Sequence, residues 1–185
     1  MSNIGIPRAL SIALSIVVMD LSYYGLHRMH HKIPYLWRLH RLHHSDRKVD
    51  ALTTVLHHPL EIISNSLLII MFYVVFDIPV VVITWFAYVM AFHTAFTHTR
   101  LVIPERMNSF LRWFIITPNM HHIHHSQDMK EGNSNFGNVF PWWDMLSKTY
   151  IYKTNKELVS VNFGIDDKES PKTNTLKNLL INPFI

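Results

Sequence analysis

Two long apolar stretches constrain the fold of this chain more than any other feature of its sequence. The first runs from Ile4 to Leu26, and the second runs from Ile62 to Phe96 with a break at Asp77-Ile78-Pro79. A transmembrane helix needs roughly 20 predominantly apolar residues in a row. The sequence therefore predicts an integral membrane protein with one N-terminal transmembrane helix over residues 4–26 and a membrane hairpin over residues 62–98.

The two arms of the hairpin are short, at about 15 to 18 residues each, so we expect them either to tilt or to reach only partway across the bilayer. The first stretch is not expected to be a cleaved signal peptide, because no small-residue cleavage site follows it. Basic residues cluster just after the first helix, whereas the Asp77 turn has none. The positive-inside bias therefore predicts that the intervening segments face the cytosol of a bacterial inner membrane or of the endoplasmic reticulum.

Composition agrees with a membrane protein and narrows the chemistry. Of the 185 residues, 49% are hydrophobic and 16% are charged, and a chain of this length is expected to form one domain, residues 1–185. The basic residues lie beside apolar segments, where they read as membrane anchors and not as a nucleic-acid surface. The sequence contains no cysteine, which excludes disulfides, thiolate ligands, iron–sulfur clusters and a cysteine nucleophile. Any metal must be held by histidine or carboxylate.

Histidine supplies the second strong signal, because most of the fourteen histidines fall in three short motifs. Residues at positions i, i+3 and i+4 share one face of a helix, so each motif is expected to aim two or three imidazoles at one point. Eight ligands exceed what one ion needs, since zinc takes about four, and two metals follow. The eight first-choice ligands are His27 and His31, then His40, His43 and His44, then His121, His124 and His125.

Two further histidines near the end of the hairpin are added to the predicted ligand set. His98 lies at the membrane boundary beside Arg100, and His93 lies deeper, where an ionisable residue is functional by default. An unbroken helix would turn these two side chains about 140° apart. They can converge on one site only if the helix ends near Thr97.

The remaining histidines are expected to support the site or to be incidental. His57 and His58 precede Pro59 at the mouth of the hairpin, which favours capping or contact with a ligand, and His58 is assigned such a supporting role. His30 and His122 point away from the ligands beside them under a helical reading, which favours support or surface positions.

Two carboxylates are predicted to support the ligands and not to bind metal. Asp20 is too far along its helix to ligate together with His27, but it can orient a neighbouring ligand or pair with a cation. Asp144 can accept an imidazole N–H or, equally, cap a helix. The chain lacks the Glu-x-x-His pairs of soluble di-iron bundles.

The expected fold is thus an all-α integral membrane protein with a cytosolic, His-rich, helical metal-binding cap. Residues 27–61 form its first cytosolic segment, residues 104–150 add an interfacial helix between Pro104 and Pro118 and the third motif, and residues 151–185 form a soluble tail. Two ions with imidazole ligands beneath an apolar roof suit activation of dioxygen by two irons for attack on an unactivated C–H bond. Zinc and copper remain alternatives, since both accept imidazoles.

A membrane metal transporter or sensor is the alternative function. Transporters hold their ions near the bilayer midplane, whereas the three histidine motifs flank the apolar segments. That placement favours an enzyme.

In the order and spacing of these motifs, the chain resembles the fatty acid hydroxylase and sterol desaturase superfamily. The resemblance is carried from about Asp20 to Tyr150 by the order and spacing of its motifs: Asp20 to His31, Leu36 to Asp46, His58-Pro59-Leu60-Glu61, His98, Thr117 to Ser126, Asn135-Phe136-Gly137 and Trp143-Asp144. The sequence departs from that pattern at Ser147-Lys148-Thr149, where Phe-Gly-Thr is usual, and it starts almost at the first motif helix.

The resemblance implies a membrane-bound enzyme with two iron ions that uses dioxygen to hydroxylate or desaturate a lipid. It implies that the eight motif histidines are ligands, that His98 matches an isolated family histidine and that His93 could complete the set. It also implies a separate electron donor, which is a cytochrome b5-, ferredoxin- or reductase-like protein, because a fused cytochrome or flavin domain does not fit in 185 residues.

Overall fold

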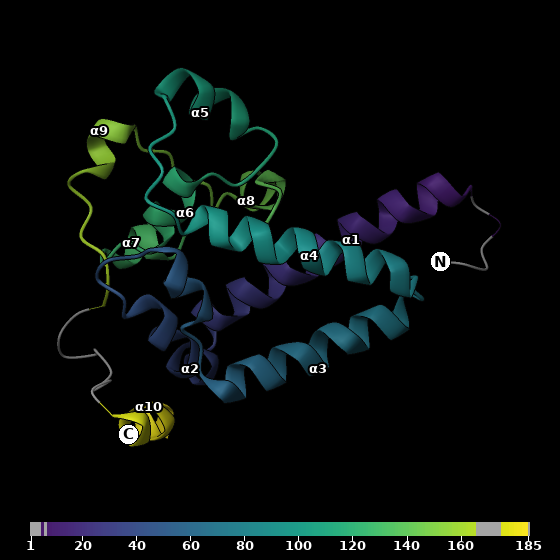
Figure 1. Ribbon diagram of the computed structural model, residues 1–185, viewed down its shortest axis with the longest axis horizontal. Helices are drawn as coiled ribbons and strands as arrows, with labels where there is room; N and C mark the ends of the chain where they lie inside the picture. Colours follow the sequence, from purple (N-terminus) through teal and green to yellow (C-terminus); the bar gives the residue numbers. More distant parts are fainter. Residues whose placement is uncertain (1–4, 6, 166–174, 185) are drawn as a thin grey trace.

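The computed structural model describes residue 5, residues 7–165 and residues 175–184, and this part of the chain is all-helical (Figure 1). The elements are, in chain order, α1 (Arg8–Lys32), α2 (Pro34–His44), η1 (Ala51–Val55), α3 (Pro59–Val75), α4 (Val80–Thr97), α5 (Glu105–Leu111), α6 (Pro118–His124), α7 (Met129–Gly132), α8 (Trp142–Ser147), α9 (Asn155–Leu158), α10 (Leu176–Ile181) and η2 (Asn182–Phe184). Within the described residues, strand-type pairing is limited to one isolated bridge between Ser126 and Phe163. The predicted all-α class is confirmed.

Three helices, α1, α3 and α4, form long arms that extend from a lobe built by the shorter helices (Figure 1). Proline marks the start of both hairpin arms: Pro59 is the first residue of α3 and Pro79 is the N-cap of α4. A proline costs little there, because the first N–H groups of a helix have no intrahelical partner. The turn between the arms includes Asp77 with a φ of 48°, so the predicted break at residues 77–79 is present.

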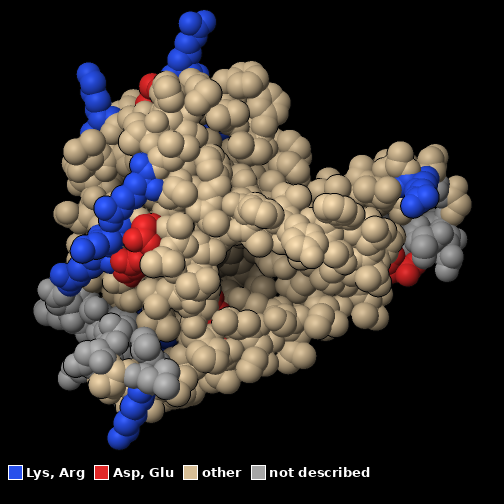
Figure 2. Space-filling model, viewed as in Figure 1, with Lys and Arg blue, Asp and Glu red and all other residues tan. Residues whose placement is uncertain are grey.

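The arms expose an extensive apolar surface. Helices α1 and α4 are long and apolar enough to cross a membrane, since each contains an 18-residue stretch with a mean hydropathy of 1.6, and α3 is apolar but shorter. Large apolar side chains on α4 are open to the surroundings, with Phe92 78% exposed and Val80 76% exposed. Charged side chains gather on the lobe and at the far tips of the arms, and the stretch between is mostly uncharged (Figure 2). An apolar surface of this extent marks a membrane or partner contact.

A small apolar core joins the first arm to the hairpin. Met19 of α1 packs with Val82 and Phe86 of α4 and with Val139 from the loop before α8. The carboxylate of Asp20, next to Met19, is fully buried and accepts hydrogen bonds from the N–H groups of Val139 and Phe140 and from the indole of Trp143. These bonds fasten the lobe to α1.

Two helices differ in extent from the sequence prediction. Helix α1 continues beyond Leu26 to Lys32 and carries the whole first histidine motif, and it ends just before Pro34, as the steric restriction on residues preceding proline requires. The predicted helix between Pro104 and Pro118 is shorter: α5 ends at Leu111 and turns follow it. Its Phe110 is 64% exposed.

Candidate metal centre

Nine histidines from four parts of the chain converge where the arms enter the lobe. They form two sets whose candidate donor atoms all lie within 4.8 Å of one another inside each set. The five-histidine group contains His27, His31, His40, His44 and His124, and the four-histidine group contains His43, His98, His121 and His125.

The same two short helices, α2 and α6, contribute to both groups. On a helix, positions i and i+4 lie about 40° apart, whereas adjacent positions lie about 100° apart. Accordingly, His40 and His44 of α2 enter the five-histidine group, while His43 enters the other. Helix α6 divides in the same way: His121 and His125 enter the four-histidine group and His124 enters the five-histidine group.

This division decides between the two numbers that were expected: the second and third motifs each aim two imidazoles at one point, and not three. The third imidazole of each motif points elsewhere, because residues three and four positions further along a helix lie about 100° apart on its surface. Each motif supplies two ligands to one group and one ligand to the other. Helices α2 and α6 thus bridge the two groups, and α1 and the end of α4 each add ligands to one of them.

Hydrogen bonds to backbone carbonyls fix how these rings face. The Nδ1 atom of His43 lies 3.1 Å from the carbonyl oxygen of Thr53, that of His98 lies 2.7 Å from the carbonyl of Thr94, and that of His124 lies 2.8 Å from the carbonyl of Ser134. A carbonyl can only accept, so Nδ1 carries the proton and Nε2 presents a lone pair. This is the usual arrangement of a histidine that binds metal through Nε2.

The four-histidine group packs its Nε2 atoms closely together. His98 Nε2 lies 3.2 Å from His43 Nε2 and 3.0 Å from His121 Nε2, and His121 Nε2 lies 3.2 Å from His125 Nε2. Since His43 and His98 both carry their proton on Nδ1, their contact opposes two lone pairs, which only a cation between them makes favourable. Two imidazole nitrogens bound at right angles about 2.1 Å from one ion lie about 3.0 Å apart, so the group fits a metal ion.

The five-histidine group shows the same fit through unpartnered atoms. The Nε2 atoms of His31, His40, His44 and His124 are buried and have no hydrogen-bond partner among the described residues. A buried polar atom without a partner is costly, and a shared ion would satisfy all four. The two groups are neighbours, because the rings of His44 and His125 stack with centroids 4.5 Å apart.

Burial keeps these imidazoles neutral, as metal ligands must be. Burial lowers the pKa of His98 to about 4 and the pKa of His124 to about 3. Burial and the neighbouring imidazoles also hold the pKa values of His43, His121 and His125 well below the usual 6.5. At neutral pH the donors need no deprotonation to bind a cation.

A third cluster, which the sequence interpretation did not single out, adjoins the five-histidine group. Glu61 is 1% exposed, and its Oε1 atom accepts hydrogen bonds from Nδ1 of His40 at 2.7 Å and from Nδ1 of His57 at 3.1 Å. The ring of His57 also stacks on that of His43, with centroids 4.4 Å apart. Glu61 was visible only as part of the His-Pro-Leu-Glu motif, since nothing in its spacing shows that it reaches His40.

The predicted supporting residues act less directly than expected. Asp144 contacts no imidazole in the described structure, but accepts the N–H groups of Phe136 and Gly137, and the carbonyl of Phe136 lies 2.9 Å from Nδ1 of His27. Asp20 bonds to Val139, Phe140 and Trp143, none of which is a histidine or a cation, and it fastens the same loop from the other side. Both carboxylates therefore shape the loop that positions His27.

The remaining histidines have separate surroundings. His58 caps α3 by accepting the N–H of Leu60, as one of its predicted roles requires. His93 belongs to neither group, and its buried Nε2 has no partner among the described residues. His30 and His122 are buried rather than on the surface, at 2% and 7% exposure.

An open cavity of about 200 Å³ lies against both groups, and histidines of each line it, together with Glu61, Asn65, Met90 and Asn138. A second cavity of about 400 Å³ shares Tyr23, His57, Glu61 and Asn65 with the first and continues between α3 and α4. Figure 2 shows a dark hollow between the arms where they meet the lobe. The metal centre is thus reached from the side of the apolar hairpin.

Comparisons with known proteins agree with this site. Residues 12–149 match the family model of the fatty acid hydroxylases. An ornithine lipid hydroxylase, OlsE, of Rhizobium tropici is 30% identical over 144 residues, covering 78% of this chain and 43% of the relative. An alkylglycerol monooxygenase of Xenopus tropicalis is 28% identical over 160 residues, covering 84% and 34%, and the C-4 methylsterol oxidase erg25 of Schizosaccharomyces pombe is 27% identical over 143 residues, covering 75% and 46%.

The chain spans less than half the length of each of these relatives. No solved structure is significantly similar to it. The relatives oxidise lipids, and together with the two apolar helices they support membrane association. Because the matching family model covers three quarters of the chain and includes every histidine of both groups, the chain belongs to the fatty acid hydroxylase family.

Proposed function

We propose that this chain is a dioxygen-dependent di-iron oxidoreductase that hydroxylates or desaturates a C–H bond of a membrane lipid. The observation that carries the proposal is the pair of adjacent all-histidine groups at the inner end of a cavity that continues into the hairpin. Hydroxylation consumes one lipid C–H bond, one dioxygen, two electrons and two protons, and it yields an alcohol and one water. Desaturation consumes the same reagents, removes two hydrogens from the lipid and yields two waters.

Bound iron would supply the redox chemistry that no protein side chain offers. The chain's own residues hold and orient the site. Glu61 and the carbonyls of Thr53, Thr94, Phe136 and Ser134 set the directions of the imidazoles. Burial excludes water, since His98, His124 and His125 are no more than 1% exposed.

The proposed substrate route runs from the bilayer between α3 and α4. The outer cavity is lined mainly by apolar side chains of the two arms, among them Ile69, Ile70, Ile83 and Ala87. Such a surface accommodates an alkyl chain, and two residues with amide side chains, Asn65 and Asn138, line the inner cavity near the histidines. The lobe, with its charged surface (Figure 2), faces the cytosol in this arrangement.

Lipid mass spectrometry of cells with and without the chain tests the proposed reaction. A product heavier by one oxygen supports hydroxylation, and one lighter by two hydrogens supports desaturation. His43→Ala should abolish either product and lower the bound iron without preventing membrane insertion. A variant that kept both its iron and its oxygen consumption would count against the proposal, and flux of zinc or iron into liposomes would favour the transport alternative.

A pair of bulky substitutions on α4 tests the route. Ala87→Trp narrows the outer cavity, whereas Val89→Trp projects into a separate apolar groove between α1 and α4. We expect Ala87→Trp to raise KM for the lipid about tenfold, which corresponds to about 1.4 kcal/mol of lost binding. Val89→Trp should leave KM within a factor of two, which corresponds to less than about 0.4 kcal/mol of binding free energy. Equal effects of the two variants would reject this route.

A further inference from the structure

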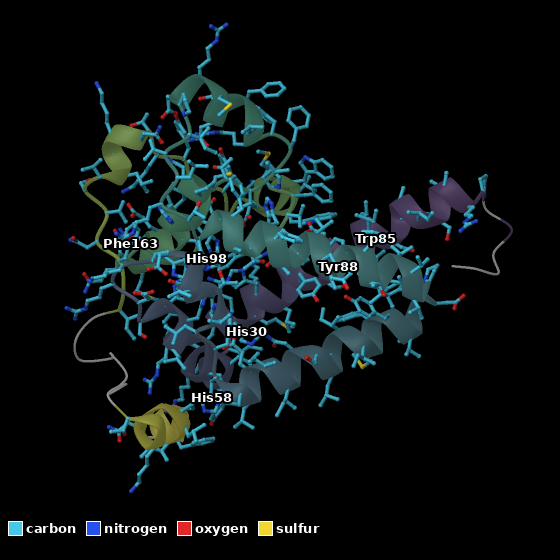
Figure 3. The ribbon with its side chains drawn as sticks, viewed as in Figure 1. His30, His58, Trp85, Tyr88, His98 and Phe163 are labelled. Carbon is cyan, nitrogen blue, oxygen red and sulfur yellow. The ribbon has the colours of Figure 1, made fainter. Side chains whose placement is uncertain are left out.

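A groove on the lobe, away from the arms, is lined by cations and by apolar side chains. We call it the basic groove. It has a volume of about 580 Å³, and its lining includes Arg47, Lys48, Arg100, His122, Val159 and Phe163. Phe163 lies at the outer edge of the lobe, on the far side from Trp85 and Tyr88 of α4 (Figure 3). The groove therefore opens away from the apolar arms.

The charge of the groove is positive at its rim. Arg47, Lys48 and Arg100 are all exposed, and the Arg100 guanidinium donates to the carbonyl of Lys48, which holds the two residues together. Among the described residues, the two carboxylates that flank Arg47 and Lys48 in the sequence have other partners: Asp46 accepts the Thr53 hydroxyl, and Asp50 caps η1. Neither carboxylate lines the groove.

Apolar side chains accompany these cations. Leu101 is 57% exposed, Val102 is 73% exposed and Val159 is 87% exposed. Exposed apolar residues rimmed by charge are typical of a protein-binding surface. A nucleic acid would instead require cations extended along one face.

The floor of the basic groove adjoins the four-histidine group. The His122 ring packs edge-on against Phe163 with centroids 5.4 Å apart, and it hydrogen-bonds to the backbone carbonyl of His98. The Nε2 atom of His98 in turn lies 3.0 Å from that of His121. One buried side chain thus separates the groove from a residue of the metal centre.

We propose that the basic groove is the docking surface for an acidic one-electron carrier protein. This inference rests on the proposed function, which consumes two electrons per turnover. Two reduced carriers each give up one electron and leave oxidised. Opposite charge favours the encounter and sets its orientation, and the contact through His122 makes this the surface from which an electron has a short bonded path to His98.

Binding of an acidic carrier tests the proposal independently of turnover. The probe is a plant-type [2Fe–2S] ferredoxin, and the protein is held in nanodiscs of uncharged phosphatidylcholine, both with iron and without it. Lys48→Glu reverses one exposed charge of the groove, and Arg38→Glu makes the same change on an exposed residue of α2 that does not line it. We expect Lys48→Glu to weaken ferredoxin binding about tenfold at low salt and to reduce its salt dependence, while Arg38→Glu changes it less than about twofold.

The outcomes separate the docking surface from the enzyme. Unchanged ferredoxin binding by Lys48→Glu, equal weakening by Arg38→Glu, or no binding to the wild type would each overturn the docking proposal. Lipid product formed with dithionite as reductant would show that the proposed function survives such a result. Conversely, Lys48-dependent ferredoxin binding without product from any reductant would support the docking surface and count against the lipid oxidation.

Discussion

The two histidine groups share two helices but differ in size and in what closes them. The five-histidine group is completed by α1, one of the three long arms, through His27 and His31. The four-histidine group is completed by the C-cap of α4, through His98 alone. The five-histidine group therefore depends on the position of a long helix and a distant loop, whereas the four-histidine group depends mainly on the end of the hairpin.

Removal of one imidazole from each group should give the largest difference between the two groups, measured as the number of irons that each variant retains. His124→Ala leaves four imidazoles in its group, whereas His125→Ala leaves three. We expect His125→Ala to lose one of two irons per chain and His124→Ala to retain both with weakened affinity, because a four-ligand set can still hold an ion. Elemental analysis after dialysis measures this. Gln127→Ala, an exposed residue that follows the motif, should keep both ions, and equal losses in the two histidine variants would remove the distinction.

Glu61→Gln should weaken only the five-histidine group. The amide oxygen of glutamine can still accept from His40 and His57 but carries no negative charge, and changing a partner of this kind costs about 10- to 100-fold in metal affinity. Competition with a chelator measures the affinity of each ion. Glu157→Gln, in an exposed cap of α9, serves as the control. A similar loss from the four-histidine group would contradict the assignment of Glu61 to one group.

Asp144→Asn should act on the same group through the loop and by a smaller amount. One carboxylate oxygen that accepts an N–H of Phe136 or Gly137 becomes an amide nitrogen. We expect the free energy of unfolding to fall by about 1 to 3 kcal/mol, with weaker iron binding near His27. Denaturant titration in detergent measures the change. Asp128→Asn, which can still cap α7, should change stability little, and an equal loss there would show a general charge effect.

Acidification should have the smallest effect, and the same effect on both groups. At pH 5.5 a free imidazole is about 90% protonated, but the pKa of His98 is about 4 and that of His124 is about 3. Iron affinity should therefore fall less than about twofold between pH 7 and pH 5.5, as dialysis at each pH can show. A sharp release near pH 6.5 from either group would contradict the lowered pKa values.

The same pKa shifts predict how the metal-free protein responds to pH. An imidazole whose pKa falls from 6.5 to about 4 on folding binds more protons in the unfolded chain between these values. The free energy of unfolding is therefore highest above about pH 6.5 and declines as the pH falls toward about 4. Thermal unfolding of the metal-free protein across this range measures the decline.

Local periodicity predicted the elements but not the partition of the ligands. The apolar stretches and the break at residues 77–79 predicted the arms, since both depend on neighbouring residues alone. The motifs predicted that His40, His43 and His44 lie near a metal centre. Their division between two groups depends on where α1 and α6 pass α2, which is a tertiary fact that no spacing within a motif contains.

Two supporting contacts were hidden for the same reason. His40 and Glu61 lie 21 positions apart, and His27 and Phe136 lie 109 positions apart. No sequence period links such pairs, because the connecting segments fold back through loops. Asp20 was predicted to orient a ligand or to pair with a cation, whereas its three partners, Val139, Phe140 and Trp143, came only from the structure.

The sharing of α2 and α6 between both groups has a consequence for assembly. Each iron would act as a cross-link among segments that are distant in sequence, and through the shared helices the two cross-links would hold one another in place. Metal binding of this kind is coupled to folding free energy. The iron available to a cell would then set the fraction of newly made chains whose lobe closes, so supply of the metal would control the abundance of folded protein as well as its activity.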